Sequence, residues 1–338
     1  MKPSGDIVIV HCGGLTSFVG AFPAMRALRR ANRGARLLLV ASEPAAALGA
    51  DTPYIDELIL AGSLDDPRET ARIAARLKLE KFECVFDLER SDASEKLFAA
   101  MKPFPPAWCG AARGMKYRFE APAGMTMAEA LSRQLGVAGV ELDAAEKPDA
   151  RWATTARSNS PSLKPEYFGL ERPYVLLAPA SPGPPAAPPR WPIARFAGLA
   201  ARLAANGVGV GVVIDPGDRG PGRAVCQAAP DARDIASRAD LTQIASLAAE
   251  AGGALGHADC GITHMMAAAG APTIAIARSP EEGAAIGPKG NVITLAAPDP
   301  THTTVEYAAQ LIAMFARVGS LDRRAKGEDV DRSAPERA

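Results

Sequence analysis

The sequence predicts an α/β protein with two domains of similar size. Its 338 residues exceed the length that one hydrophobic core usually supports. Short apolar runs of strand length alternate with amphipathic helical patterns, first over residues 1–155 and again over 174–303. Between the two series, residues 156–173 lack periodicity and contain three prolines. Because such alternation is typical of a parallel sheet covered on both faces, we expect two α/β domains joined by a linker.

The first domain opens with a strand, a turn and a helix. Residues 7–10 are apolar throughout, as in a fully buried strand, and a glycine turn follows them. The next helical pattern places Phe18, Met25 and Leu28 on one face. The other elements expected in this domain are strands at 37–40, 58–60 and 84–88 and helices at 66–78 and 93–101.

The second domain repeats the alternation. The elements expected there are strands at 174–178, 208–214, 254–256, 273–276 and 292–295 and helices at 193–205, 241–251 and 262–269. A last helix is expected over 304–318. Residues 319–338 have almost nothing apolar to bury and are predicted to be disordered.

The composition favours a globular protein of a reducing compartment. Hydrophobic residues make up 48% and charged residues 22% of the chain, which is far from the signature of disorder. Lysine plus arginine and aspartate plus glutamate balance at 38 each, so no global field gathers nucleic acid. Five cysteines without paired spacing and four histidines argue against a disulfide framework and a metal site. No run suits a signal peptide or a membrane span, so we expect a cytoplasmic protein, with peripheral membrane contact left open.

The strongest candidate site segment is 256–272, because loops at the carboxyl ends of strands line the ligand crevice of open α/β sheets. It combines a small-residue turn with an Ala-rich helix, whose free N–H groups and positive dipole end suit a phosphate. We expect Asp259 to cap this helix or bind a sugar hydroxyl, with Thr263 and His264 in or near the first turn. The alternative is that Asp259 is an N-cap alone and His264 a packing residue.

A second candidate loop is the proline-rich segment 178–192. Arg190 is a candidate anion partner there and Trp191 a candidate apolar wall. The alternative is a stiff connector between a strand and a helix.

A third candidate loop, 11–20, carries Gly13, Gly14 and Gly20. These glycines do not make Gly-x-Gly-x-x-Gly, so the signal for a nicotinamide enzyme is weak. Neighbours on a strand point to opposite faces, which also argues against a catalytic pair of His11 and Cys12.

In order and spacing, these loops resemble the heptosyltransferases, the family nine glycosyltransferases of bacterial envelope synthesis. The likeness spans roughly residues 5–317. It rests on four segments: 15–28 with its Arg-Ala-Leu, 82–88 with its terminal Asp-Leu, Arg190-Trp-Pro192, and Asp259-Cys-Gly-Ile-Thr-His264 with the Ala-rich stretch 267–272.

The resemblance implies a GT-B fold of two facing Rossmann-like domains, with the acceptor on the N-terminal and the nucleotide-sugar donor on the C-terminal domain. It implies inverting transfer of a heptose from an ADP-linked donor to lipopolysaccharide or another glycan acceptor, without a metal or resident cofactor. The final helix, 304–318, is implied to cross back to the first domain. The implied donor-binding residues are Ser181, Arg190, Asp259, Cys260, Gly261, Thr263 and His264, and the implied acceptor-side residues are Gly13 and Gly14.

Three positions depart from the family's pattern. Ser17 stands where the family has an aspartate taken to be the general base, and a serine hydroxyl does not titrate near neutral pH. Pro189 replaces a phosphate-binding lysine, so the neighbouring Arg190 is the candidate cation. Cys260 replaces a threonine and is a weaker hydrogen-bonding group.

These departures leave two hypotheses open. General-base catalysis contributes about 100-fold to 10,000-fold in rate, so an active enzyme needs a substitute base. The candidates are Asp87, Glu89 and Asp92 at the end of the fourth strand, and the alternative for each is solvated surface. The rival hypothesis is a protein that binds a nucleotide-sugar or a partner without turnover. Both place the diphosphate on the backbone amides that follow Asp259.

Overall fold

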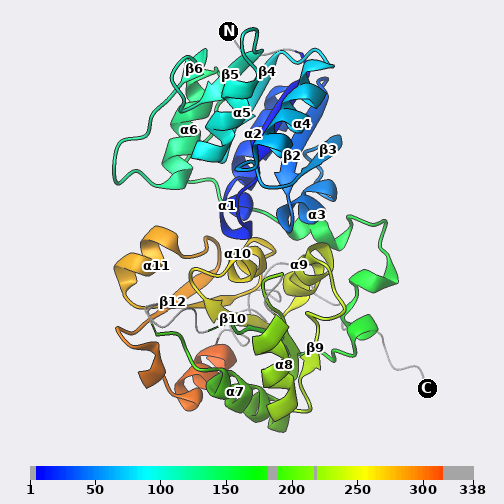
Figure 1. The fold of residues 1–338 in the computed structure, drawn as a ribbon. Helices are drawn as coiled ribbons and strands as arrows, with labels where there is room; N and C mark the ends of the chain where they lie inside the picture. Colours follow the sequence, from blue (N-terminus) through cyan, green and yellow to red (C-terminus); the bar gives the residue numbers. More distant parts are fainter. Residues whose placement is uncertain (1–4, 182–188, 217–218, 315–338) are drawn as a thin grey trace, which may run out of the picture.

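A computed structural model describes residues 5–181, 189–216 and 219–314, which form two α/β domains, one above the other in Figure 1. The first domain contains β1 (Ile7–His11), α1 (Leu15–Gly20), α2 (Phe22–Ala31), β2 (Leu37–Ser42), α3 (Ala45–Ala50), β3 (Glu57–Ala61), α4 (Pro67–Lys78), β4 (Cys84–Asp87), α5 (Asp92–Ala100), β5 (Ala107–Gly110), β6 (Tyr117–Arg118) and α6 (Met127–Val137).

Short 3-10 helices lead to the second domain. They are η1 (Arg151–Thr154), η2 (Pro161–Leu163) and η3 (Pro165–Phe168). The second domain contains β7 (Tyr174–Ala178), α7 (Ile193–Ala205), β8 (Gly209–Val212), α8 (Arg219–Ala228), β9 (Arg233–Asp234), α9 (Leu241–Glu250), β10 (Gly253–His257), α10 (Gly261–Ala268), β11 (Thr273–Ala277), α11 (Pro280–Ile286), β12 (Val292–Ala296) and η4 (Pro300–His302).

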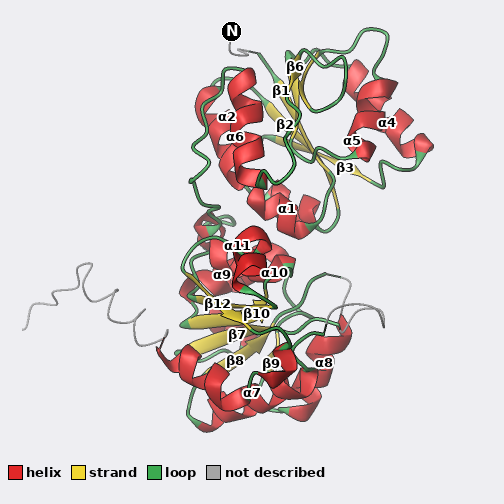
Figure 2. Ribbon diagram, turned by 90° about the vertical axis from the view of Figure 1, so that its left-hand side faces the viewer, coloured by secondary structure: helices red, strands yellow, loops and turns green. Residues whose placement is uncertain are grey.

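Each domain is built on a six-stranded parallel sheet with helices packed against it (Figure 2). The strand orders are β3-β2-β1-β4-β5-β6 and β12-β11-β10-β7-β8-β9. The order therefore reverses between β1 and β4 and again between β7 and β10, and open α/β sheets bind ligands outside such reversals. The predicted pair of Rossmann-like domains is confirmed.

Several elements were not expected from the sequence. The strands β6 and β9 have two residues each, too few for any alternation to register. The helix α3 is Ala-Ala-Ala-Leu-Gly-Ala, which carries no polar face and therefore no helical period. The helices α6, α8 and α11 and the strand β5 were missed as well.

The connection 156–173, expected to be a linker, packs on the second domain. Leu163 and Phe168 are buried, and the Ser246 hydroxyl on α9 donates to the Leu163 carbonyl at 2.9 Å. The segment therefore extends the second domain's surface and is anchored along its length.

The described part of the last helix, 305–314, also lies on the second domain. Its Ala308 and Ile312 are buried in one hydrophobic cluster with Trp191 and Phe196. The expectation that this helix crosses back to the first domain is wrong for 305–314, because its apolar face is buried against the second domain. Residues 315–318 and the predicted disordered tail 319–338 lie outside the described residues.

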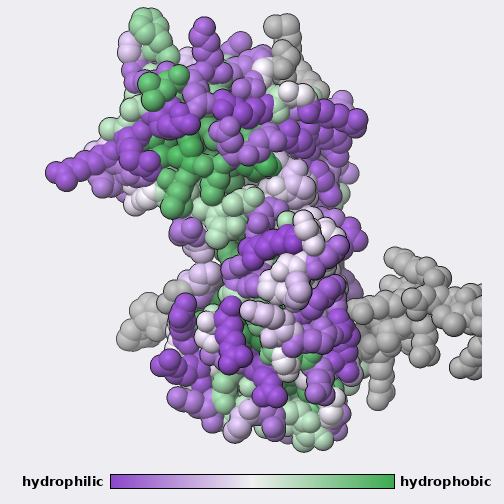
Figure 3. Space-filling view, turned by 90° about the vertical axis from the view of Figure 1, so that its right-hand side faces the viewer, coloured by the Kyte–Doolittle hydropathy of each residue, from purple (hydrophilic) through white to green (hydrophobic). Residues whose placement is uncertain are grey.

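The helix α1 lies at the waist between the domains and packs on α10 (Figures 1 and 2). Gly261 permits this approach, since a β-carbon there would lie 2.7 Å from Leu15 Cβ. Beside this contact, Arg157 forms 2.7 Å ion pairs with Asp51 of the first domain and Asp240 of the second. The space-filling view shows the two lobes and a hollow at one side of the waist (Figure 3).

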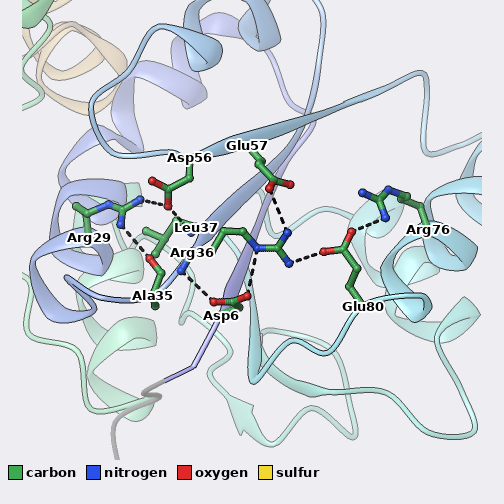
Figure 4. A network of polar contacts seen from close by, with 9 residues as sticks. All are labelled: Asp6, Arg29, Ala35, Arg36, Leu37, Asp56, Glu57, Arg76 and Glu80. Carbon is green, nitrogen blue, oxygen red and sulfur yellow. Dashed lines mark hydrogen bonds and ion pairs between the residues drawn. The ribbon is translucent and has the colours of Figure 1, made fainter.

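A network of charged residues closes the amino-terminal end of the first sheet, at the far end of the domain from the waist (Figure 4). Arg36 pairs with Asp6 at 3.2 Å, with Glu57 at 3.1 Å and with Glu80. The hydrogen bonds that Arg36 donates to Glu80 and Glu57 raise its pKa. The carboxyl end of the sheet therefore remains as the end that faces a ligand.

Candidate active site

A cavity of about 560 Å³ lies between the two domains. Its first-domain wall comes from α1, α2, α6 and the segment 142–148. Its second-domain wall comes from His264 on α10 and from residues 285–287 and 289. The volume falls within the usual range for small-molecule sites, and both domains contribute to the lining.

The loop after β1 brings Ser17 into this cavity. The turn at Gly13 and Gly14 starts α1, and Gly14 and Ser17 both line the cavity. The Ser17 hydroxyl donates to the Gly14 carbonyl at 2.9 Å. At position 17, where the resemblance implies a base, the cavity thus holds a hydroxyl that is engaged with the backbone. His11 is buried against Phe18, with ring centroids 5.2 Å apart, and forms no pair with Cys12.

The three substitute bases expected from the sequence do not line this cavity. Asp87 is fully buried, Glu89 accepts the Cys12 N–H at 2.6 Å, and Asp92 is exposed on the first turn of α5. Glu89 nevertheless lies near Ser17, since a β-carbon at Gly13 would stand 3.5 Å from Glu89 Cγ and 3.0 Å from Ser17 Oγ. Its role as a substitute base therefore stays a prediction.

Asp87 is instead placed to hold the turn after β4. Its carboxylate accepts the N–H of Arg90 at 2.8 Å and the Ser94 hydroxyl at 2.7 Å. Arg90 has a φ of 61°, a left-handed conformation uncommon for a residue with a side chain, and the Asp87 contact stabilises it. Burial raises the pKa of Asp87 to about 6.

The start of α10 is occupied by a carboxylate that the sequence analysis missed. Asp215, three residues after the end of β8, accepts the Ile262 N–H at 2.8 Å and the Gly261 N–H at 3.3 Å. It also accepts the Cys260 thiol at 3.1 Å. The expectation that these amides are free for a diphosphate is therefore wrong for this conformation, because a negative group already satisfies them.

The flanking residues of this turn also differ from expectation. Asp259 does not cap α10, since its carboxylate pairs with Arg190 at 2.5 Å and the N-cap is Cys260. Thr263 is fully buried against Gly256, where a β-carbon would lie 2.3 Å from its hydroxyl. Cys260 is buried, and burial raises the pKa of its thiol, so it is not a thiolate.

His264 is the predicted donor residue that does face the cavity. Its Nε2 lies 2.8 Å from the Ala258 carbonyl oxygen and donates to it. Burial lowers the pKa of His264, so the ring is neutral near pH 7. At the end of β10, burial lowers the pKa of His257 to about 4.

The cavity lining contains charged residues that sequence reasoning missed. Asp143 and Lys147 come from the irregular segment before η1, and Lys289 follows α11. Glu146 lies beside them and pairs with Arg26 at 2.6 Å. No periodicity marks these segments, so the sequence offered no signal that they meet Ser17.

A smaller cavity of about 210 Å³ lies on the other side of the waist. Ile214 and Pro216, the neighbours of Asp215, line it together with Arg219, and the first domain contributes Glu43. Ser181 and Pro189 border residues 182–188, which lie outside the described residues, so the structure tests no donor contact for Ser181.

Among residues 5–181, 189–216 and 219–314, no group of three or more His, Cys, Asp or Glu side chains is arranged to hold a metal ion. No described helix has the length and apolar character to cross a membrane.

Comparison with known structures shows the same architecture. The glycosyl transferase family 9 structure from Veillonella parvula DSM 2008 has a TM-score of 0.76 and 16% identity, covering 94% of this chain and 99% of that chain. E. coli ADP-heptose lps heptosyltransferase II has a TM-score of 0.71 and 16% identity, with coverage of 93% and 99%. E. coli heptosyltransferase WaaC with ADP gives 0.69 and 16%, with coverage of 92% and 99%.

The family assignment comes from the sequence match. The comparison with curated proteins gave no match. The model of glycosyltransferase family 9 (heptosyltransferase), however, matches residues 70–308, which is more than half of the chain. With the two-domain fold and the interdomain cavity, this match shows that the chain belongs to glycosyltransferase family 9, the heptosyltransferase family.

Proposed function

We propose that this protein transfers a heptose-like sugar from a nucleoside-diphosphate donor to a cell-envelope glycolipid or another glycan, with inversion and without a metal. The observation that carries the proposal is the cavity that Ser17 and Asp143 of the first domain share with His264 and Lys289 of the second. Donor and acceptor meet there, and oriented contact between two substrates is itself a large part of catalysis.

The diphosphate takes the place of Asp215 at the start of α10. The amides of Gly261 and Ile262 already bind a carboxylate there, so their geometry suits an anion. Lys289 stands in for the lysine missing at position 189, since it lines the cavity and adds positive charge near His264. The smaller cavity beside Asp215 takes the nucleoside, with Ile214 as an apolar wall.

Asp143 is our candidate for the base. Glu146 is held by Arg26, whereas the Asp143 carboxylate accepts the Ala145 N–H at 2.8 Å and is exposed in the cavity lining. A carboxylate in that place abstracts the acceptor's hydroxyl proton, which Ser17 cannot do.

The finer identities follow the family. ADP-heptose as donor and lipopolysaccharide as acceptor are supported by the relatives, one of which is WaaC with ADP-2-deoxy-2-fluoro heptose. Transfer to such an acceptor places this chain on the cytoplasmic side of the inner membrane, in peripheral contact with it.

A second candidate function is binding of a nucleotide-sugar or a partner without turnover. Two observations favour it: the hydroxyl of Ser17 at the base position and the Asp215 carboxylate on the amides of α10. A protein that keeps both in the presence of nucleotide has no base and no diphosphate site, which favours binding of a partner over binding of a nucleotide-sugar.

One experiment separates the two functions. The protein is titrated with ADP-, UDP- and GDP-linked sugars by calorimetry, and each donor that binds is assayed for product with glycan acceptors. Product formation supports the transferase. Binding without product, followed by a gain of product in Ser17→Asp, supports an impaired transferase. A failure to bind any donor contradicts both the transferase and the nucleotide-sugar-binding function.

A further inference from the structure

Part of the first-domain wall of the interdomain cavity is apolar. Val19 on α1, Ala24 on α2 and Leu131 on α6 line it, together with Leu142. Such a wall offers no partner for sugar hydroxyls, and a buried hydroxyl without a hydrogen bond destabilises its complex. The wall therefore suits a different part of a substrate.

The mouth of the same cavity carries two exposed hydrophobic side chains, one from each domain. Met127 at the start of α6 is 37% exposed and Ile286 at the end of α11 is 45% exposed, and both line the cavity. Gly20 leaves room for the Met127 side chain, since a β-carbon at position 20 would lie 3.2 Å from the methionine sulfur. A flexible thioether adapts to ligands of varied shape, and its exposure in the unliganded protein is unfavourable.

Two lysines flank this apolar wall. Lys147 from the first domain and Lys289 from the second both line the cavity, and the neighbouring Glu146 is neutralised by Arg26 and Arg30. Apolar walls beside cations complement an amphiphile with a hydrocarbon portion and an anionic head.

We propose that the acceptor is an amphiphile whose hydrocarbon portion lies in this cavity, against α1, α2 and α6, with its anionic head at Lys147. The inference rests on the proposed function and adds a hydrophobic subsite to the acceptor side. The sugar hydroxyl that receives the transferred residue then lies beside Asp143, which lines the same cavity as Ser17.

The test uses n-hexyl, n-octyl and n-decyl β-D-glucoside as probes, titrated below their micelle concentrations into the full-length protein. Each buried methylene is expected to tighten binding about threefold to fourfold. n-Decyl phosphate is expected to bind more tightly than n-decyl glucoside, with inorganic phosphate alone as the control for the head group. Equal affinities across the glucoside series would overturn the inference.

Two variants place the binding at the cavity mouth. Met127→Gln and Ile286→Gln are expected to weaken n-decyl glucoside binding by about fivefold to tenfold, since each removes apolar contact. Val137→Gln is the matched control, because Val137 is 47% exposed on the same helix as Met127 but does not line the cavity. Equal effects of Met127→Gln and Val137→Gln would show binding elsewhere and overturn the inference.

Donor binding is measured separately on the same proteins. If the donor binds but the affinity of the alkyl glucosides does not depend on their chain length, the hydrophobic subsite is overturned and the proposed function stands. If the wild-type protein binds no nucleotide-sugar donor, the proposed function is contradicted, regardless of the affinities measured for the glucosides.

Discussion

The two walls of the interdomain site are in opposite states. On the donor side, Asp215 satisfies the amides of α10 and Arg190 pairs with Asp259, so the polar groups expected to bind a diphosphate are paired within the protein. On the acceptor side, Met127 and Leu131 face an open cavity of about 560 Å³. Under the proposed function, the donor therefore has to displace a carboxylate, whereas the acceptor enters a site already formed.

The same contrast affects how the donor and the acceptor each bind. Displacing Asp215 costs hydrogen bonds that are recovered only when the diphosphate arrives, so the two anions compete for one site. The acceptor's apolar portion meets no such competitor. We therefore treat Asp215 as the group that decides whether this chain is a transferase or a binding protein.

The largest expected effect is on the acceptor side. Asp143→Asn is expected to lower kcat by about 100-fold to 10,000-fold, since the amide cannot accept the acceptor's proton. The asparagine oxygen can still accept the Ala145 N–H, so the local backbone is retained. Glu141→Gln, outside the cavity lining, is the control in the same product assay. Unchanged kcat in Asp143→Asn would remove Asp143 as the base.

The next effect concerns His257, buried beside Phe196 under the donor side, with ring centroids 5.9 Å apart. Its pKa of about 4 in the folded protein lies below the unfolded value near 6.5, so the unfolded state binds the proton first on acidification. His257 therefore contributes stability that is present above pH 6.5 and lost toward pH 4, on the order of 3 kcal/mol.

His257→Asn is expected to lack that loss, measured as the free energy of unfolding in urea at each pH. The comparison must be made against wild type because Asp87, with its pKa raised to about 6, acts in the opposite direction. Its contribution is present below about pH 4 and is lost as the pH rises through 6. Parallel curves for wild type and variant would contradict the assignment to His257.

A third prediction tests whether Asp215 blocks the α10 amides from binding a diphosphate. Asp215→Ala is expected to tighten binding of a nucleoside diphosphate by about tenfold to 100-fold, because two amides are released from a charged acceptor. Asp66→Ala removes the side-chain cap of α4 in the first domain and is the matched control. Both variants should lose about 1 kcal/mol of stability, but calorimetry should show tighter binding in Asp215→Ala alone.

The smallest effect concerns the spacing of the two walls. Arg157→Ala removes ion pairs to Asp51 and Asp240 that are partly exposed, so the expected loss in free energy of unfolding is below about 1 kcal/mol. X-ray scattering should nevertheless show a broader range of interdomain distances. Arg202→Ala, which breaks a pair with Glu306 inside the second domain, should leave the scattering unchanged.

The fold was readable from the sequence because its signals are local. The apolar run at 7–10 and its counterparts in the second series occur as buried parallel strands, and the turn before α10 lies where its small residues predicted. Elements whose burial depends on distant neighbours, such as β6 and the Ala-rich α3, carry no such signal.

The site was less readable because it is assembled from distant segments. Asp215 lies 45 residues before Cys260 in the chain, so no spacing rule connects its carboxylate with the α10 amides. Asp143 and Lys289 lie in irregular segments of different domains and meet only in the folded chain. His264 was found because it shares a turn with the helix start.

A crystal structure with bound ADP tests the role of Asp215 most directly. We expect diphosphate oxygens within hydrogen-bonding distance of the Gly261 and Ile262 amides, with the Asp215 carboxylate turned away from both. ADP bound while Asp215 still accepts the Ile262 N–H at its present 2.8 Å would contradict the proposed donor site.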